Sequence, residues 1–450
     1  MEQKKRVLLI AYYFPPCGMG GVQRAAKLAK YLPQFGWDVT VLTVKDIAYY
    51  QKDESLLEDV QSAEIKRTGS LDPLRLAYIF SGKSGTHNAV RSNNIGAKLF
   101  RFIERCLFVP DSKKLWIPFA FARAARIIKQ QNIRAVISTA PPFSSHILTL
   151  FLARSFRLPW VADFREGWTN RDILPPPAFY RSINRILEKL VVKKADKVVG
   201  ISQRIINFLQ EIEPHKKEKF TLVYNGFDED DFKPRILGAE TGNFTITFLG
   251  TAAEWTDPSV FIPGICRAAE RNPVFKEYLD LQIVGNILHS AFMEAINQSA
   301  IKDRTTITGY LPHRQAIKRL MKSNILLFPV TIYNTTGYIT GKIYEYLASG
   351  IPVLAHTPAG EARNILSQFS DETFFDDGKN DEKTAEFILE KFAQWHSNLQ
   401  TKKSSCVESE PYKRKDFEIF SRKNQAKTIA GLLDEIIPLS GIRPGAGDAD

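Results

Sequence analysis

Residues 334–345 (NTTGYITGKIYE) contain the residue types that bind a phosphorylated ligand. They form a loop that leads into a predicted helix. The N–H groups of Thr340 and Gly341 lie at the helix start, where they have no partners within the helix and the helix dipole is positive. Lys342 adds a cation, and the carboxylate of Glu345, one turn further along, could accept hydrogen bonds from ribose hydroxyls. The segment is not a Walker loop, because its glycine spacing is one residue short and no Ser or Thr follows the lysine. We therefore predict that a diphosphate binds at the start of this helix.

A second glycine-containing loop, residues 15–24 (PPCGMGGVQR), follows the first predicted strand. Gly20 and Gly21 allow the backbone to approach a ligand closely, and the helix that follows begins with free N–H groups. The loop begins like a dinucleotide-binding fingerprint. However, Gln23 occupies the place of the third glycine, and the second strand does not end on an acidic residue. This argues against a nicotinamide or flavin cofactor. The alternative to ligand binding is a turn that only reverses the chain.

Charged residues follow the predicted strand PWVADF at residues 159–164. Asp163 and Arg165 could orient an acceptor hydroxyl or stabilise a leaving phosphate, and we predict that both are catalytic. His146, after STAPP, could face the same cleft and is the third predicted catalytic residue. The alternatives are an ion pair that caps the strand and a structural histidine.

The elements that must position these residues alternate between short β-branched runs and helix-length amphipathic segments, which is typical of parallel α/β architecture. One series of strands ends at FTLVYN (220–225), and a second begins at FTITFLG (244–250). We predict two doubly wound, Rossmann-like domains that face one another across a cleft. The predicted parts are an acceptor domain (1–228), a linker (229–243), a donor domain (244–415), a helix that packs back on the first domain (416–438) and a disordered tail (439–450).

The segment KIYEYLASGIPVLA (342–355) resembles the signature of the family 4-type (group 1) glycosyltransferases, which are two-domain enzymes of the GT-B fold. Further segments follow the family's order over residues 5–435: FPPCGMGGVQRAAKLAKYLPQFGWDVTVLT, VYNGFDEDDF, ITFLGT, LQIVG and ITGYLPHRQAIKRLMKSNILLFPV. ADFREGW is similar to a pattern in a bacterial branch that makes polysaccharides, with Glu166 as a departure from that pattern.

The resemblance implies that Glu345 is the second glutamate of the E-x7-E motif, which binds the donor's ribose. The first glutamate is replaced by Gly337, and Glu254 is a candidate substitute. Gly250, Thr251 and Tyr310 are expected to complete the donor site. The resemblance also implies transfer of a sugar from a nucleoside-diphosphate sugar to a hydroxyl acceptor, with retained anomeric configuration. The alternatives are a GT-B nucleotide-sugar epimerase and a binding protein without catalysis.

No cofactor or catalytic metal is expected. Asp228-Glu229-Asp230 has the Asp-x-Asp spacing of metal-dependent sugar transferases, but its place at the domain junction favours a solvated turn. No other group of acids and histidines has ligand spacing. The nucleotide sugar would therefore act as a co-substrate, and N–H dipoles and basic side chains would stabilise the departing diphosphate.

Charge is distributed unevenly along the 450 residues. The net charge is +12, with +14 in residues 1–230, and residues 91–134 hold ten basic residues against two acidic ones. Large apolar residues lie between these charges. This favours an anionic membrane surface and a lipid-linked acceptor, although an ordinary amphipathic helix has the same pattern. The charge lies in one half only and no nucleic-acid module is present, which argues against nucleic-acid binding.

The sequence also bears on the compartment. It has no apolar run long enough to span a membrane, and its four cysteines are widely scattered. We expect a cytoplasmic protein, peripheral on the inner membrane face. The oligomeric state cannot be predicted from the sequence.

Overall fold

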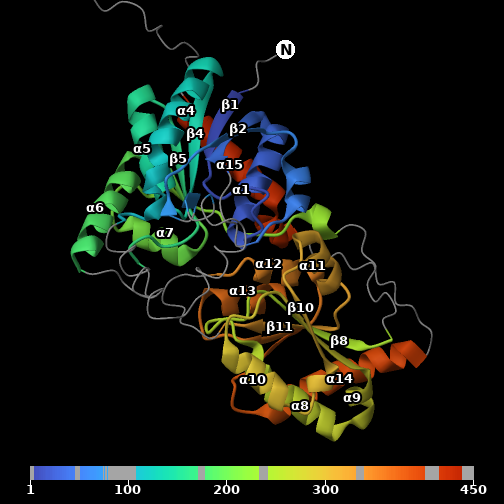
Figure 1. Cartoon of the computed structure of the whole chain (residues 1–450). Coiled ribbons are helices and arrows are strands. Elements are labelled where there is room, and N and C mark those ends of the chain that lie inside the picture. Colours follow the sequence, from blue (N-terminus) through green and yellow to red (C-terminus); the bar gives the residue numbers. More distant parts are fainter. Residues whose placement is uncertain are drawn as a thin grey trace, which may run out of the picture.

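The computed structural model describes residues 5–45, 51–73, 75–76, 79, 108–170, 178–232, 242–330, 339–400 and 415–437. Within these ranges the chain forms two parallel β-sheets, each covered by helices on both faces (Figure 1). This arrangement confirms the predicted fold class of two doubly wound α/β domains. Residues 91–107 of the basic segment, Gly337 and the predicted tail at 439–450 lie outside the described residues.

The first sheet has seven strands in the order β3-β2-β1-β4-β5-β6-β7, and every pair is parallel. The strands are β1 Lys5–Ile10, β2 Trp37–Val44, β3 Glu64–Thr68, β4 Ile133–Ala140, β5 Trp160–Phe164, β6 Lys197–Gly200 and β7 Phe220–Leu222. The helices are α1 Gly20–Tyr31, α4 Ile117–Gln130, α5 Ser144–Phe156, α6 Ala178–Lys194 and α7 Gln203–Gln210. The central strands β1, β4 and β5 are almost wholly buried, as expected for a parallel sheet covered on both faces.

The second sheet has six parallel strands in the order β10-β9-β8-β11-β12-β13. The strands are β8 Phe244–Leu249, β9 Leu279–Val284, β10 Thr305–Gly309, β11 Ile325–Pro329, β12 Val353–His356 and β13 Thr373–Phe375. The helices are α8 Ile262–Arg271, α9 Pro273–Tyr278, α10 Ser290–Gln298, α11 His313–Leu320, α12 Lys342–Ser349, α13 Glu361–Phe369 and α14 Asp381–Gln400. Helices α11, α12 and α13 lie on the side nearer the first sheet, and α8, α9 and α14 lie on the far side (Figure 1).

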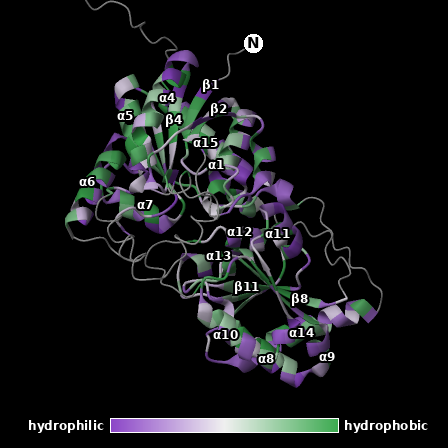
Figure 2. Ribbon diagram, in the orientation of Figure 1, coloured by the Kyte–Doolittle hydropathy of each residue, from purple (hydrophilic) through white to green (hydrophobic). Residues whose placement is uncertain are grey.

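Short 3-10 helices connect several of these elements. They are Leu32–Phe35, Glu54–Val60, Ser112–Trp116, Lys217–Lys219, Glu229–Phe232, Pro258–Phe261, Lys302–Arg304 and Lys415–Phe420. Green, hydrophobic residues run along the strands of both sheets, and the outer helices alternate between green and purple (Figure 2). Each outer helix therefore has one apolar stripe that packs on a sheet. Among the described residues, no helix is sufficiently long and apolar to span a bilayer.

The end of the chain returns to the first sheet. Helix α15 (Arg422–Ile436) packs on α1, and its Ala426, Ile429 and Leu433 share a core with β1 and β4. On its way the chain runs beside the outgoing segment, where Phe227 and Ser421 form a β-bridge. A Cβ on Gly226 would lie 1.8 Å from the carbonyl oxygen of Phe420, so this close crossing requires glycine. The two crossing segments thus lie tightly together between the two sheets.

Candidate functional site

A cleft of about 1180 Å³ lies between the two sheets and is lined by residues from both. On one side are the start of α1 and the segment that follows β5. On the other side are the loops after β8, β9 and β10 and the start of α12. Carboxyl ends of parallel strands and helix N-termini are where doubly wound sheets bind phosphorylated ligands. The fold therefore brings the ligand-binding ends of both sheets together at one cleft.

The predicted donor-binding residues all line this cleft, although they come from widely separated segments. They are Gly20, Gly21, Gly250, Thr251, Tyr310, Thr340, Gly341, Lys342 and Glu345. Arg165 also lines it, whereas Asp163 and His146 do not. Glu254 is exposed and lies outside the lining, which argues against it as a substitute for the missing glutamate.

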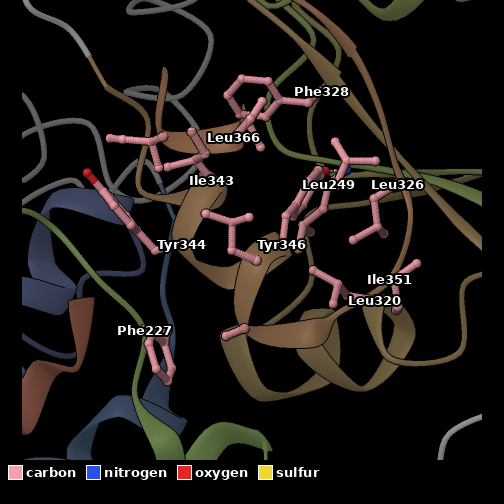
Figure 3. Close-up of a cluster of buried hydrophobic side chains, with 14 of the residues drawn as sticks. Phe227, Leu249, Leu320, Leu326, Phe328, Ile343, Tyr344, Tyr346, Ile351 and Leu366 are labelled. Carbon is pink, nitrogen blue, oxygen red and sulfur yellow. Dashed lines mark hydrogen bonds between the residues drawn. The ribbon is translucent and has the colours of Figure 1, made fainter. Parts of the chain in front are cut away.

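Helix α12 is held firmly by its buried face. Ile343, Tyr344 and Tyr346 are at most 1% exposed and pack into the core shown in Figure 3. The hydroxyl of Tyr346 accepts a hydrogen bond from the N–H of Leu249 (3.0 Å) and donates one to the carbonyl of Leu327 (3.2 Å). These bonds tie the helix to the ends of β8 and β11. Its first turn, with the positive end of the dipole, therefore has a fixed position at the cleft.

The two charged residues of that first turn form an ion pair. Lys342 Nζ lies 2.9 Å from Glu345 Oε2, and Glu345 is only 9% exposed although it lines the cleft. His313, at the start of α11, lies on the other side of this carboxylate, with Nδ1 4.0 Å from Glu345 Oε1. Its Nε2 lies 2.9 Å from Asp231 Oδ2. Our sequence reasoning did not single out His313, because nothing local indicates these partners.

Three strands of the second sheet end at or just before glycines near the cleft. Gly250, Gly285 and Gly309 follow or end β8, β9 and β10, and all have positive φ. A Cβ on Gly285 would lie 1.8 Å from the carbonyl oxygen of Gly250. The ends of β8 and β9 can therefore lie this close together only because Gly285 carries no side chain. Tyr310, just beyond β10, reaches across the cleft and donates a hydrogen bond to the carbonyl of Gly18 (3.1 Å).

Asp163 does not face the cleft, contrary to the sequence prediction. It is fully buried, and its carboxylate accepts hydrogen bonds from Arg24 Nε (3.0 Å), Arg24 Nη2 (2.8 Å) and Thr139 Oγ1 (2.8 Å). Burial raises the pKa of Asp163, but Arg24 and these hydrogen bonds outweigh it and hold the pKa below its usual value. This geometry corresponds to the alternative that the sequence left open, an ion pair within the first domain. In the structure, Asp163 fixes Arg24 of α1.

Arg165 does lie at the cleft, in a position that the sequence anticipated. Its guanidinium donates hydrogen bonds to the carbonyl of Gly21 in the first turn of α1 and to those of Ala140 and Pro141 after β4. A Cβ on Gly21 would lie 2.6 Å from Arg165 Nη1, so a side chain here would displace the guanidinium. Arg165 thus joins two loops and places a positive charge beside the start of α1.

His146 is buried in the core of the first domain and not in the cleft. Its Nδ1 lies 2.7 Å from Ser138 Oγ, and its ring centroid lies 4.4 Å from that of Phe164. Nε2 has no hydrogen-bond partner among the described residues. Burial lowers the pKa of His146 to about 3, so the ring is neutral at physiological pH. The expectation that His146 faces the cleft is therefore not met.

The Asp-x-Asp segment at the domain junction is not a solvated turn, as the sequence had suggested. Asp228 is 3% exposed and pairs with Lys27 (2.5 Å) and Lys30 (2.8 Å) of α1. Asp231 of the same turn bonds His313, so the turn connects α1 to α11. Asp228 and Asp230 are thus used in ion pairs with α1, although Asp230 remains 55% exposed. Within the described ranges, no three His, Cys, Asp or Glu side chains gather as metal ligands.

Comparison with known proteins supports the class that the sequence resemblance implies, a glycosyltransferase of the GT-B fold. Residues 19–231, slightly less than half of the chain, match Glycosyltransferase Family 4. A glycosyltransferase from Rickettsia africae is structurally similar, with a TM-score of 0.60 at 16% identity over 97% of this chain and 100% of that one. Anabaena HepE, solved in complex with UDP, gives 0.59 at 13% identity over 96% and 100%. A Listeria monocytogenes protein described as a putative UDP-N-acetylglucosamine 2-epimerase gives 0.53 at 13% identity over 99% and 100%. No curated protein matches in sequence.

Proposed function

We propose that this glycosyltransferase, which carries a family 4 domain within a GT-B fold, transfers a sugar from a nucleoside-diphosphate sugar to a hydroxyl acceptor. One observation carries the proposal. The first turn of α12, with Lys342 and Glu345, faces a cleft that both domains line. The diphosphate would bind at Gly341 and Lys342, and the ribose would bind at Glu345. Bound UDP in the structurally similar HepE supports a uridine nucleotide as the first donor to test.

The reaction develops negative charge on the departing diphosphate, and the cleft offers groups that stabilise it. The N–H groups at the start of α12, the Lys342 ammonium and the Arg165 guanidinium carry positive charge towards this space. Glu345 is paired with Lys342, so a phosphate that binds there would compete with the carboxylate for the ammonium. We further propose that transfer is metal-independent and retains the anomeric configuration, with the leaving phosphate assisting attack on the same face.

The acceptor would approach from the first domain. On α4, Arg126 and Lys129 are exposed beside Phe119, which is 40% exposed. Phe151 on α5 and Ile186 on α6 are also exposed, and α5 contacts both α4 and α6. Lys113 belongs to the same segment of sequence but is buried against Asp72. The α4–α6 surface supports a lipid-linked acceptor in cell-surface polysaccharide synthesis, with the protein peripheral on the cytoplasmic face of the membrane.

The membrane part of the proposal predicts that charge on α4 governs vesicle binding. We expect the double variant Arg126→Gln/Lys129→Gln to bind phosphatidylglycerol vesicles about 30-fold more weakly, since each basic residue near an anionic surface contributes about 1 kcal/mol. Flotation with the exposed pair Lys276→Gln/Lys318→Gln as control measures this. Wild-type protein that shows no preference for phosphatidylglycerol over phosphatidylcholine would contradict membrane binding.

The function itself is tested by a panel of nucleotide sugars with the purified chain. We expect one donor to be hydrolysed slowly and selectively without acceptor, releasing nucleoside diphosphate and free sugar. The structural similarity to the Listeria protein makes an epimerase the second candidate. An epimerase would instead convert the donor to its epimer without a second substrate. If the purified chain bound no nucleoside diphosphate, that result would indicate that the protein lacks this activity.

A further inference from the structure

Arg422 is a buried cation at the cleft that our sequence reasoning did not single out. It is the first residue of α15, lines the cleft and is only 7% exposed. Helix α15 otherwise belongs to the core of the first domain. Burying a charge is costly unless another group compensates it. The question is therefore what compensates this guanidinium.

The described residues supply little negative charge to compensate the Arg422 guanidinium. Arg422 Nη1 donates to the neutral amide oxygen of Gln425 (3.2 Å), and no carboxylate among the described residues lies within ion-pair distance. Burial and the nearby Arg24 lower the pKa of Arg422 to about 10, and Glu345 and Asp228 act in the opposite direction. Asp163 is used by Arg24, and Glu345 by Lys342. Among the described residues, no carboxylate forms an ion pair with Arg422, although Glu345 and Asp228 act on it from further away.

The position of Arg422 is also fixed before any ligand binds. Its backbone N–H donates to the carbonyl of Phe227 (2.9 Å), next to the β-bridge between Phe227 and Ser421. The close crossing at Gly226 holds the same segment. Its charge acts on Tyr344 and Glu345, so it lies within electrostatic reach of the first turn of α12. A cation whose backbone is already fixed loses less conformational freedom when it binds a phosphate.

We propose that Arg422 binds a phosphate oxygen of the donor's diphosphate, together with Lys342 and the N–H groups at the start of α12. This inference rests on the proposed function and names a second cation for its donor site. The arginine comes from the helix that packs on the first domain, so donor binding would connect both halves of the protein. Its planar fork can donate two parallel N–H bonds to two phosphate oxygens, a bidentate geometry that an ammonium does not offer.

Variants at Arg422 test the role with ligands that differ in their phosphates. The probes are the tightest-binding member of UDP, GDP and ADP, the matching nucleoside, and inorganic pyrophosphate. We expect Arg422→Gln to weaken the diphosphate and pyrophosphate by about 10- to 100-fold and to leave nucleoside binding unchanged, since only a charged hydrogen bond is lost. Arg422→Lys should restore part of the affinity. Arg267→Gln, at an exposed site on α8, is the matched control.

Three results are distinguishable. Equal diphosphate affinity in wild type and Arg422→Gln, with affinity lost in Glu345→Ala, would overturn the inference and leave the proposed function intact. Equal loss of nucleoside and diphosphate, with a lower unfolding midpoint, would also overturn it and show that Arg422 only supports the fold. No binding of any probe by wild type would overturn the proposed function and the inference with it.

Discussion

Glu345→Ala is expected to weaken binding of the cognate nucleoside diphosphate by about 1.5–3 kcal/mol, or roughly 10- to 150-fold in Kd. The expected cause is the loss of hydrogen bonds from the ribose hydroxyls to a nearly buried carboxylate. Glu345 is 9% exposed and is fixed by the first turn of α12. Calorimetric titration with UDP, GDP and ADP measures the change.

Glu345→Ala should change the binding of pyrophosphate and of the nucleoside in different ways. Removing Glu345 frees the Lys342 ammonium from its 2.9 Å ion pair, so pyrophosphate should bind as well as before or more tightly. The matching nucleoside should bind more weakly. Glu254→Ala, at an exposed position outside the cleft lining, serves as the control and should change neither. Unchanged diphosphate affinity in Glu345→Ala would contradict the placement of the ribose.

Asp163→Asn is expected to lower the free energy of unfolding by about 3–5 kcal/mol, because it leaves the buried Arg24 guanidinium without its counter-ion. Both side chains are at most 3% exposed. The folded pKa of Asp163 lies below its ordinary value, so its stabilisation is present above about pH 4 and is lost as the pH falls through the folded pKa. The difference between wild type and variant should therefore be largest near neutral pH and should shrink in acid.

Denaturant unfolding across this pH range measures the effect of Asp163→Asn. Glu382→Gln, which breaks the exposed pair with Arg267, is the control and should move the midpoint little. A catalytic Asp163 would give a different result. Turnover would be abolished while the free energy of unfolding stayed at the wild-type value, and that outcome would contradict the structural role.

Much of the fold could be predicted because its signals are local. The buried runs at β1, β4, β5 and β8 read as strands by their residue types alone. Loop glycines before α1 and α12 indicated where backbone would face a ligand, and these positions do line the cleft. Strand β13 was missed, because three residues (TFF) at the edge of the sheet carry too short a pattern.

The errors at the site concern partners that are distant in sequence. The end of β5 could be located, but the side chain of Asp163 turns towards Arg24, 139 positions earlier. His146 follows a strand end as a cleft residue would, but its helix turns the ring towards Ser138 and Phe164. The final helix was expected over residues 416–438, and nothing local indicated that its Arg422 would be buried at the cleft. Side-chain direction and long-range pairing decide these roles, and neither is visible in local composition.

The central claim is that the first turn of α12 binds a nucleoside diphosphate, and a crystal structure of the protein with UDP or its best-binding counterpart tests it most directly. We predict phosphate oxygens within hydrogen-bond distance of the Gly341 or Lys342 N–H and ribose hydroxyls on the Glu345 carboxylate. A nucleotide seated elsewhere, with Lys342 and Glu345 still paired only to each other, would contradict the account.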